Sequence, residues 1–543
     1  MVAFQPLDWF WVGAYTVLTI FLGLSFYFLG KKSAEEFFIA GRGLPWWLPS
    51  TSVYATHTAT DTPIWMMGSI YRYGVAGIWL GFFTAWAAIS AFVSTKIFRR
   101  SLAYTHAEYQ ALRFGGLGGE LLRGWFAGWQ IFIQMFILGW VGIAMGRVAN
   151  LAFGWDEWVG LVLFGLVGAI YTIAAGYWGA IIADVQQGFV AFVVIVLVSV
   201  WGAQAAGGVD GIRERLAASG QEWKLDPFAF TGLFTGDFSV FWFFTILFVA
   251  IIGGLGMGSS IDWYTEAQRI QSAKTVRDAS WAMWSGTLLI LVRNSIWAVA
   301  MLAFVALFPT LDLGDPAQAR TAELGWYHIG FETFPVGLVG FFFAAILAIH
   351  LSTISSSMNL GALYWTRDIY HHYIKPEATD HQLVRMGRIA TGVMLLGSFV
   401  YGSIIGNITE WLIFALWIMV AGVWLPNILQ VVWWRVNAWG YLVTWIANLG
   451  VSWIFVWILP ALDVIPSFHE SYQFWILLAI SALIFIPVTL LTPPESMDRL
   501  VDFYDAARPV GWWRPVRREW ERRQVTASSP AQAAKGKTVG AKA

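Results

Sequence analysis

The chain has 543 residues, of which 58% are hydrophobic and only 12% charged, and its mean hydropathy is +0.62. A soluble domain carries about 25% charged residues, so this composition indicates an integral membrane protein. The net charge of zero argues against nucleic acid as a partner, and the absence of cysteine excludes disulfides, thiolate nucleophiles and cysteine metal sites. Continuous apolar runs of about 20 residues favour spanning helices over the alternating strands of a β-barrel.

The first 44 residues contain an apolar run that we expect to be a retained spanning helix. No basic residue precedes this run, and the run is too long for the core of a signal peptide. Lys31 and Lys32 follow it and are expected to hold its far end in the cytoplasm.

About thirteen apolar runs predict spanning helices along the whole chain. Their approximate bounds are 8–30, 45–70, 75–97, 122–147, 155–177, 181–204, 238–258, 279–308, 332–360, 386–406, 408–433, 437–460 and 471–492. Basic residues, Arg269 among them, gather in alternate loops. This bias predicts a multi-pass protein of the inner (plasma) membrane with its N-terminus outside and its C-terminus in the cytoplasm.

The second span, 45–70, is interrupted at its centre by polar residues. They are Thr56, His57, Thr58, Thr60, Asp61, Thr62 and Pro63. Pro63 removes a backbone donor, and a charged Asp61 in mid-membrane costs roughly 2.5–3.5 kcal/mol. A single Thr in a span is more often a packing residue that bonds to its own helix. The whole cluster, with its acid and its proline, instead predicts a helix that is unwound for a function.

The seventh span ends in a second weak point. Its glycines are Gly253, Gly254, Gly256 and Gly258. The two interrupted spans open two blocks of five spans, 45–204 and 238–433, which an extracellular loop (205–237) separates. This order predicts inverted repeats with a binding site in mid-membrane. Two peripheral spans (434–492) and a cytoplasmic tail (493–543), disordered from about residue 524, complete the expected plan.

The ninth span carries a polar stripe within "IHLSTISSSMNLGALYWTRDIY". On a helix, Ser352, Ser356 and Asn359 fall near one meridian with Ile349, and other hydroxyls flank them. Neutral hydroxyl and carbonyl oxygens suit a monovalent cation that must later leave, whereas several carboxylates would suit calcium or magnesium.

The segment "STISSSMNLGALYWTRDIY" resembles the eighth core helix of the sodium:solute symporter family. Further segments resemble other parts of that family in the same order. They are "FFIAGRGLPWWLPSTSVYATHTATDT" (first core helix), "IIADVQQGFVAF" (fifth), "EAQRIQSAKTVRDA" (the loop after the sixth), "VVWWRVNAWG" and "LTPPESMDRLVDFYDAARPVGWWRPVR". The resemblance implies an all-α, LeuT-type fold with a 5+5 inverted-repeat core. It also implies alternating access, in which sodium entry drives the import of a small solute.

The family's core sodium site would fall on two helices of this chain. The resemblance implies as ligands the carbonyls of Ala55, Thr58 and Ile349 and the hydroxyls of Ser352 and Thr353. A site shared in this way exists only when the two helices lie together, which would couple ion binding to the conformation.

Some relatives bind a further sodium on an acid of the fifth core helix. The matching residues here are Asp184, Ser352, Ser355 and Ser356. Asp184 also has a plainer interpretation as a helix N-cap, because it follows "GYWGAIIA" near a span end. The sequence therefore leaves open whether one or two sodium ions bind.

The sequence says less about the solute, which could be a sugar, a sugar acid, an amino acid or a carboxylate. Candidate lining residues are His57, Asp61, Thr62, Thr84 and Trp263. Most of the 35 Trp must be interface or packing residues, which weakens the case for Trp263. Gly81 stands where a sugar-binding relative has Glu, so a close copy of that sugar pocket is not expected.

Arg293 lies inside the eighth span, where a cation is costly. It either pairs with a carboxylate such as Asp61, Asp184 or Asp262, or lies near the solute path and favours an anion.

Other function classes remain as alternatives. They are a proton-coupled transporter of the same fold, which would titrate His57, Asp61 or Asp184, and a transporter-like sensor. An enzyme is not expected, because the sequence has no His-rich metal cluster and no nucleophile–base pair. Apart from the solute, the sodium and the bilayer, no obligate partner is evident.

Overall fold

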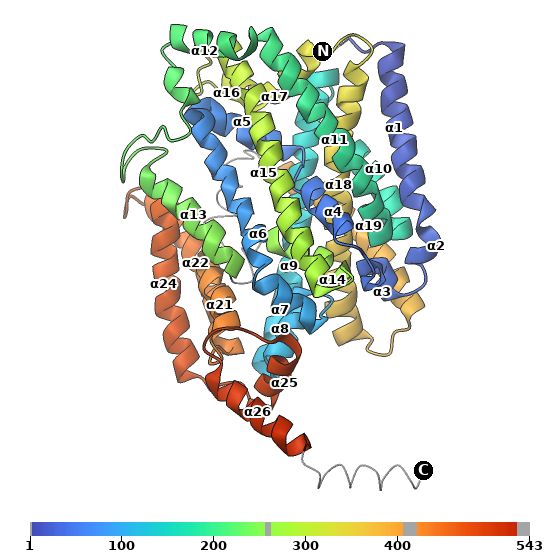
Figure 1. The fold of residues 1–543 in the computed structure, drawn as a ribbon, viewed down its shortest axis with the longest axis vertical. Helices are drawn as coiled ribbons and strands as arrows, with labels where there is room; N and C mark the ends of the chain where they lie inside the picture. Colours follow the sequence, from blue (N-terminus) through green and yellow to red (C-terminus); the bar gives the residue numbers. More distant parts are fainter. Residues whose placement is uncertain (1–2, 256–261, 405–420, 529–543) are drawn as a thin grey trace.

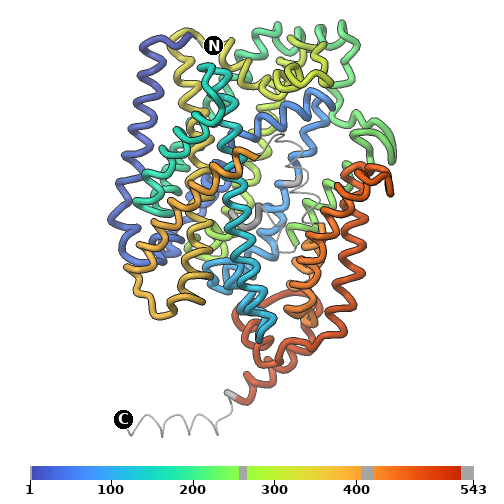
Figure 2. The backbone as a smooth tube through the Cα atoms, turned by 180° about the vertical axis from the view of Figure 1, so that it is seen from behind, coloured from blue at the N-terminus to red at the C-terminus, as the bar shows by residue number. Residues whose placement is uncertain are grey.

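The computed structural model describes residues 3–255, 262–404 and 421–528, and within these ranges the chain forms helices and no strand. The spanning helices pack into one bundle (Figures 1 and 2). The N-terminus lies at the same end of this bundle as α12, whereas α25 and α26 lie at the opposite end (Figure 1).

The first block of the core begins with a helix in two pieces. Its elements are α4 (Trp47–Thr56), α5 (Asp61–Tyr73), the 3-10 segment Gly74–Ala85, α6 (Trp86–Ser90), α7 (Ser94–Ser101), α8 (His106–Arg113), α9 (Gly116–Phe153), α10 (Glu157–Ala175) and α11 (Tyr177–Ala205). The turn between α10 and α11 requires Gly176, whose φ is +62° and whose added Cβ would lie 2.4 Å from the carbonyl oxygen of Phe37.

The second block also opens with two helical pieces. Its elements are α13 (Val240–Leu255), α14 (Asp262–Ser272), α15 (Val276–Leu307), α18 (Val339–Tyr364) with the π-helical segment Trp365–Ile374, α19 (Asp380–Ile404) and α21 (Ala421–Val432). Gly256 and Gly258 lie outside the described residues. The sequence predicts a loop over "EAQRIQSAKTVRDA", and this prediction is wrong in its first half, because Glu266 to Ser272 belong to α14.

Further helices lie around these two blocks or at the ends of the bundle. They are α1 (Pro6–Ser25), α2 (Tyr27–Gly30), α3 (Ala34–Ile39), α12 (Gly208–Ala218), α16 (Pro316–Glu323), α17 (Gly325–Thr333), α22 (Ala438–Trp453), α23 (Leu459–Ala461), α24 (Glu470–Leu491), α25 (Met497–Ala507) and α26 (Arg514–Ser528). The tail is therefore helical as far as Ser528, although the sequence predicts disorder from about residue 524.

Burial ranks the spanning helices from the centre to the periphery of the bundle. In the most apolar stretch of α18 and its π-helical continuation, 94% of the residues are buried. The corresponding share is 17% in α1 with α2 and 28% in α24. In the described part of the chain, ten helical runs are long and apolar enough to cross a membrane, and α13 and α21 are shorter apolar helices. The expected count of about thirteen is not confirmed, and half of span 408–433 lies outside the described residues.

Two glycines let neighbouring helices approach α4 closely. A Cβ added to Gly188 of α11 would lie 3.4 Å from the Cβ of Ala55, and one added to Gly286 of α15 would lie 2.8 Å from the Cβ of Val53. Such small residues allow membrane helices to pack with their backbones close together. As a result, α4 is held between α11 and α15, at the end where its backbone unwinds.

Candidate cation and solute site

The helical break between Thr56 and Asp61 follows from local hydrogen bonding. Thr58 donates its hydroxyl to the carbonyl oxygen of Tyr54 at 2.7 Å, and such side-chain bonds compete with the regular helix pattern. Pro63 lies in the first turn of α5, where the backbone N–H that it lacks would have no partner within the helix. The predicted interruption of the second span is thus present.

Three neighbouring helices hold the carbonyl groups of this break. Thr353 of α18 donates to the carbonyl oxygen of Thr56 at 2.9 Å. Tyr327 of α17 donates to that of Thr60 at 2.7 Å. Arg293 of α15 donates from Nη1 to that of His57 at 2.6 Å. Three carbonyl groups of the unwound backbone are therefore paired inside the protein, where lipid cannot reach them.

The hydroxyl stripe of α18 faces this break and α11. Ser352 donates to Oδ1 of Asp184 at 2.7 Å, and the hydroxyls of Ser356 and Thr56 lie 3.2 Å apart. Asn359 accepts a bond from Gln268 of α14 at 2.8 Å. One face of α18 thus presents its polar groups to α4, α11 and α14.

The residues expected at the core sodium site come from the two helices that meet here. Ser352 is fully buried and Thr353 is 5% exposed, and both lie against the end of α4 or its neighbour α11. The carbonyl oxygen of Ala55 accepts a bond from the backbone N–H of Thr58 at 3.0 Å. Neutral hydroxyl and carbonyl oxygens fit a monovalent cation better than a divalent one.

Two of the residues expected at the second sodium site, Asp184 and Ser356, contact an arginine. Arg269 of α14 donates to the hydroxyl of Ser356 at 2.8 Å from Nη2 and to that of Ser52 at 3.0 Å from Nε. Its Nη2 lies 3.9 Å from Oδ2 of Asp184, and both side chains are 1% exposed. Ser52 also donates to Asp184. A guanidinium therefore already provides the positive charge beside this buried carboxylate.

The prediction that Arg269 is a basic residue of a cytoplasmic loop is wrong. Arg269 lies in α14, and its polar partners come from α4, α11 and α18. The expected repeat could have located Arg269 in a helix. Since α5 follows the interruption after α4, a repeat predicts that a helix also follows the glycines of the seventh span.

Two further observations concern Asp184 and Ser355, which are expected at the second sodium site. Asp184 is not a helix N-cap, because α11 begins seven residues earlier, at Tyr177. Ser355 donates to the carbonyl oxygen of Ser352 in its own helix at 3.1 Å, so its hydroxyl is occupied within α18.

The candidate solute residues are only partly brought together. His57 lies in the break, with its Nδ1 2.9 Å from the carbonyl oxygen of Val53 and 3.4 Å from Oε1 of Glu266. Asp61 begins α5, and the Thr62 hydroxyl accepts from the N–H of Ala59 at 3.3 Å.

Of the remaining candidates, one bonds within its own segment and the other lies outside the described part. Thr84 donates to the carbonyl oxygen of Gly81 in its own segment at 2.9 Å. The side chain of Trp263 lies outside the described residues. A Cβ added to Gly81 would lie 2.8 Å from Cη2 of Trp65, so that ring fills the space beside Gly81.

Arg293 is the other buried cation at the break. Besides the His57 carbonyl, its Nη1 reaches the hydroxyl of Thr58 at 2.5 Å, and its Nε and Nη2 reach Oδ1 of Asn294 at 3.1 and 2.7 Å. The guanidinium also lies 4.5 Å from the ring centroid of Trp297. Among the described residues, its hydrogen bonds therefore go to neutral groups and not to the carboxylates proposed from the sequence.

Comparison with known proteins decides the family. A sequence profile described as the sodium:solute symporter family matches residues 37–447. The chain belongs to this family. It is accordingly a multi-pass membrane transporter that couples solute movement to sodium, and not an enzyme.

Similar curated proteins carry different solutes. The chain is 27% identical over 404 residues to the sodium/glucose cotransporter of Vibrio parahaemolyticus, covering 70% of this chain and 71% of that protein. It is 24% identical over 508 residues to the osmoregulated proline transporter OpuE of Bacillus subtilis, covering 90% and 96% respectively.

A solved structure supports the fold. The substrate-bound, outward-open structure of a Na+-coupled sialic acid symporter matches with a TM-score of 0.71 at 18% identity, covering 91% of this chain and all of that one. The predicted LeuT-type helical fold is thereby confirmed.

Proposed function

We propose that this symporter imports a small polar organic solute across the plasma membrane, with its N-terminus outside and its tail in the cytoplasm. The contact that supports this mechanism is the bond from Thr353 to the Thr56 carbonyl, because it joins the two helices that supply the core sodium ligands. The basic residues at the ends of the spans support the orientation.

The proposed core sodium ligands are the carbonyls of Ala55, Thr58 and Ile349 and the hydroxyls of Ser352 and Thr353. A bound sodium supplies a positive charge that these oxygens stabilise. Thr353 and Ser352 would exchange their present bonds to Thr56 and Asp184 for the ion. Sodium binding is then linked to the position of α18 against α4, which is the link that coupling requires.

We also propose a second sodium site, which requires a movement of Arg269. Its ligands would be Asp184, Ser352, Ser355 and Ser356. Arg269 would have to withdraw from Asp184 and Ser356 before an ion could take its place. One sodium per transport cycle is therefore the stoichiometry that the present arrangement favours.

The solute is proposed to bind beside the break, at His57, Asp61 and Thr62, with Thr84 and Trp263 as further candidates. Its class stays open, since similar proteins carry solutes as different as glucose and proline. A thermal-unfolding screen of sugars, sugar acids, amino acids and carboxylates in sodium and in potassium buffer would find it, because ligands of the native state stabilise it.

Uptake of the identified solute into proteoliposomes then tests the coupling. An inward sodium gradient should drive accumulation, and potassium in its place should not. Uptake that persists without sodium and collapses with the proton gradient would contradict the proposed ion. Binding without any uptake would instead indicate a sensor.

A further inference from the structure

A groove with both charged and aromatic lining lies on the side of the bundle, between α7 and the start of α15. Its volume is about 700 Å³. It is lined by Ala91, Phe92, Lys96, Arg100, Val276, Arg277, Ser280, Trp281 and Trp284. Of the two helices, α7 lies toward the end of the bundle that carries α25 and α26 (Figure 1). None of these residues belongs to the proposed sodium or solute sites.

The charged part of the groove has three basic side chains. Lys96 and Arg100 come from α7, and Arg277 comes from the first turn of α15. Among the residues that the structure describes, none of the three makes an ion pair or a hydrogen bond. The nearest acid in sequence, Asp278, accepts a bond from the hydroxyl of Thr275 at 2.6 Å in the cap of α15. The groove therefore presents a concentration of positive charge.

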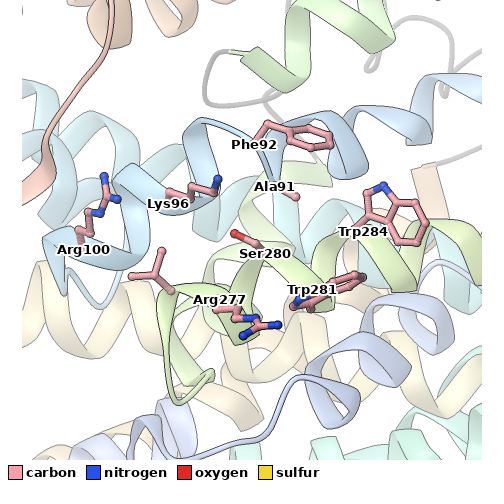
Figure 3. A pocket seen from close by; sticks show the side chains of 9 residues that line it. Ala91, Phe92, Lys96, Arg100, Arg277, Ser280, Trp281 and Trp284 are labelled. Carbon is pink, nitrogen blue, oxygen red and sulfur yellow. The ribbon is translucent and has the colours of Figure 1, made fainter.

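The aromatic part of the groove is exposed. Phe92, Trp281 and Trp284 are 61%, 47% and 41% exposed. Figure 3 shows Arg100 at one end of the groove and Phe92 and Trp284 at the other. On a membrane-spanning bundle, exposed aromatic rings of this kind face the acyl chains and the headgroup region.

A buried hydroxyl adds a second polar group to the groove. The Oγ of Ser280 lines it, is shielded from solvent and makes no hydrogen bond within the described part of the chain. Buried polar atoms of folded proteins are nearly always paired, so this hydroxyl is available to a bound group. A phosphate oxygen would accept from it.

We propose that this groove binds an anionic phospholipid. The phosphodiester would lie among Lys96, Arg100, Arg277 and the Ser280 hydroxyl, and the acyl chains would lie along Phe92, Trp281 and Trp284. Basic pockets between spanning helices on the cytoplasmic side suit such headgroups, and the orientation proposed above places this end of the bundle there. Because the lipid would bridge α7 and α15, it would stabilise their packing.

Lipid retention by the purified, full-length protein tests the proposal. Phosphatidylglycerol and phosphatidylcholine with the same acyl chains would be titrated separately in detergent, and bound lipids counted by native mass spectrometry. We expect tighter binding of phosphatidylglycerol to the wild type. The Lys96→Gln/Arg100→Gln/Arg277→Gln variant should lose about fivefold in affinity for each cation removed.

A matched variant distinguishes binding of the lipid in the groove from general electrostatic attraction of the lipid to a basic surface. Lys32→Gln/Arg385→Gln/Arg518→Gln removes three exposed cations outside the groove and should bind phosphatidylglycerol like the wild type. Equal losses in both variants, or unchanged binding in the groove variant, would overturn the proposal. Equal affinity of the wild type for the two lipids would also overturn it.

Unfolding temperatures in lipid-free detergent verify that the groove variant is folded. They should match the wild type, since the three replaced side chains make no hydrogen bond in the described structure. The lipid measurement needs neither sodium nor solute, so its outcome is independent of the proposed transport mechanism.

Discussion

Thr353 donates its hydroxyl to the carbonyl oxygen of Thr56 at 2.9 Å and so ties the central helix α18 to the unwound end of α4. These residues are 297 positions apart in the chain and come from different helices. A cation that takes both oxygens as neighbours would therefore bind to one arrangement of these two helices better than to others. Differential affinity of this kind is what allows an ion to shift a conformational equilibrium.

The first prediction concerns the two hydroxyls of the core sodium site. Ser352→Ala/Thr353→Ala should abolish sodium-driven uptake in proteoliposomes, because both side-chain ligands are lost. The loss of two hydrogen bonds should destabilise the fold by only about 1–3 kcal/mol, so the protein should still be purified in folded form.

Two control variants on the same helix accompany that experiment. Ser357→Ala removes a buried hydroxyl that makes no hydrogen bond within the described residues, and it should leave sodium dependence unchanged. Ile349→Val should also be mild, since only the backbone of Ile349 is assigned to the ion. Full sodium-driven uptake in the double variant would remove Ser352 and Thr353 from the site.

The second prediction concerns the charge beside Asp184. Removing Arg269 alone leaves that carboxylate buried without its cation, which costs about 3–5 kcal/mol, whereas neutralising both partners costs much less. In potassium buffer, Arg269→Gln should therefore unfold at a clearly lower temperature than wild type, and Arg269→Gln/Asp184→Asn should recover most of that loss.

The effect of sodium on the unfolding temperature then tests whether the site at Asp184 can hold an ion. If sodium binds at Asp184 once the guanidinium is gone, exchange of potassium for sodium should stabilise Arg269→Gln more than wild type. The added stabilisation should disappear in the double variant. No added stabilisation in Arg269→Gln would rule out the second sodium site as assigned.

Much of the architecture follows from features that act locally. Pro63 and the hydroxyls around it disrupt a helix through neighbouring backbone groups, so the break could be located from the sequence. The stripe of α18 follows from helical periodicity, and the structure indeed turns Ser352 and Ser356 toward α4 and α11.

The partners of the buried arginines could not be derived in that way. Arg269 reaches Ser52 and Arg293 reaches His57 across more than 200 residues of chain. Neither residue type nor spacing encodes such a pairing, which depends on how the helices pack. Charge patterning predicts a loop at Arg269, because positive charge usually marks loop ends, whereas a buried carboxylate and three hydroxyls surround this side chain.

The third prediction tests whether Arg293 supports the break. Arg293→Met would leave the side-chain oxygen of Asn294 without its donor and the carbonyl of His57 with only the long, 3.5 Å bond from the Thr62 hydroxyl. A buried group that loses its partner costs about 1–3 kcal/mol. Thermal unfolding should fall accordingly, and sodium-driven uptake should weaken because the unwound segment loses a fixed position. Arg293→Lys should restore little, because an ammonium cannot reproduce the planar fork that reaches both partners.

An exposed arginine provides the comparison for that variant. Arg213 has a side chain that is 71% exposed and pairs with Glu222, so Arg213→Met should change stability by less than about 1 kcal/mol. If Arg293→Met kept the stability and the uptake of the wild type, the conformation of the unwound segment would not depend on the guanidinium.

The last prediction concerns the C-terminal tail, which packs against the end of the bundle. Trp513 is 2% exposed, and its indole N–H donates to the carbonyl oxygen of Val431 at 2.8 Å. The guanidinium of Arg113, from α8, lies 4.8 Å from its ring centroid. Trp513→Ala should therefore lower the free energy of unfolding by about 3–5 kcal/mol, as truncation of a buried tryptophan does.

The neighbouring Trp512 supplies a control with the same chemistry, because its side chain is 68% exposed. Trp512→Ala should change stability by no more than about 0.5 kcal/mol, as surface substitutions usually do. Urea-induced unfolding in detergent would compare the two variants. A similar small effect of both would mean that the tail does not contribute to stability. A large effect of Trp513→Ala alone would show that α8 and the tail form one packed unit, because Arg113 stacks on that ring and not on its exposed neighbour.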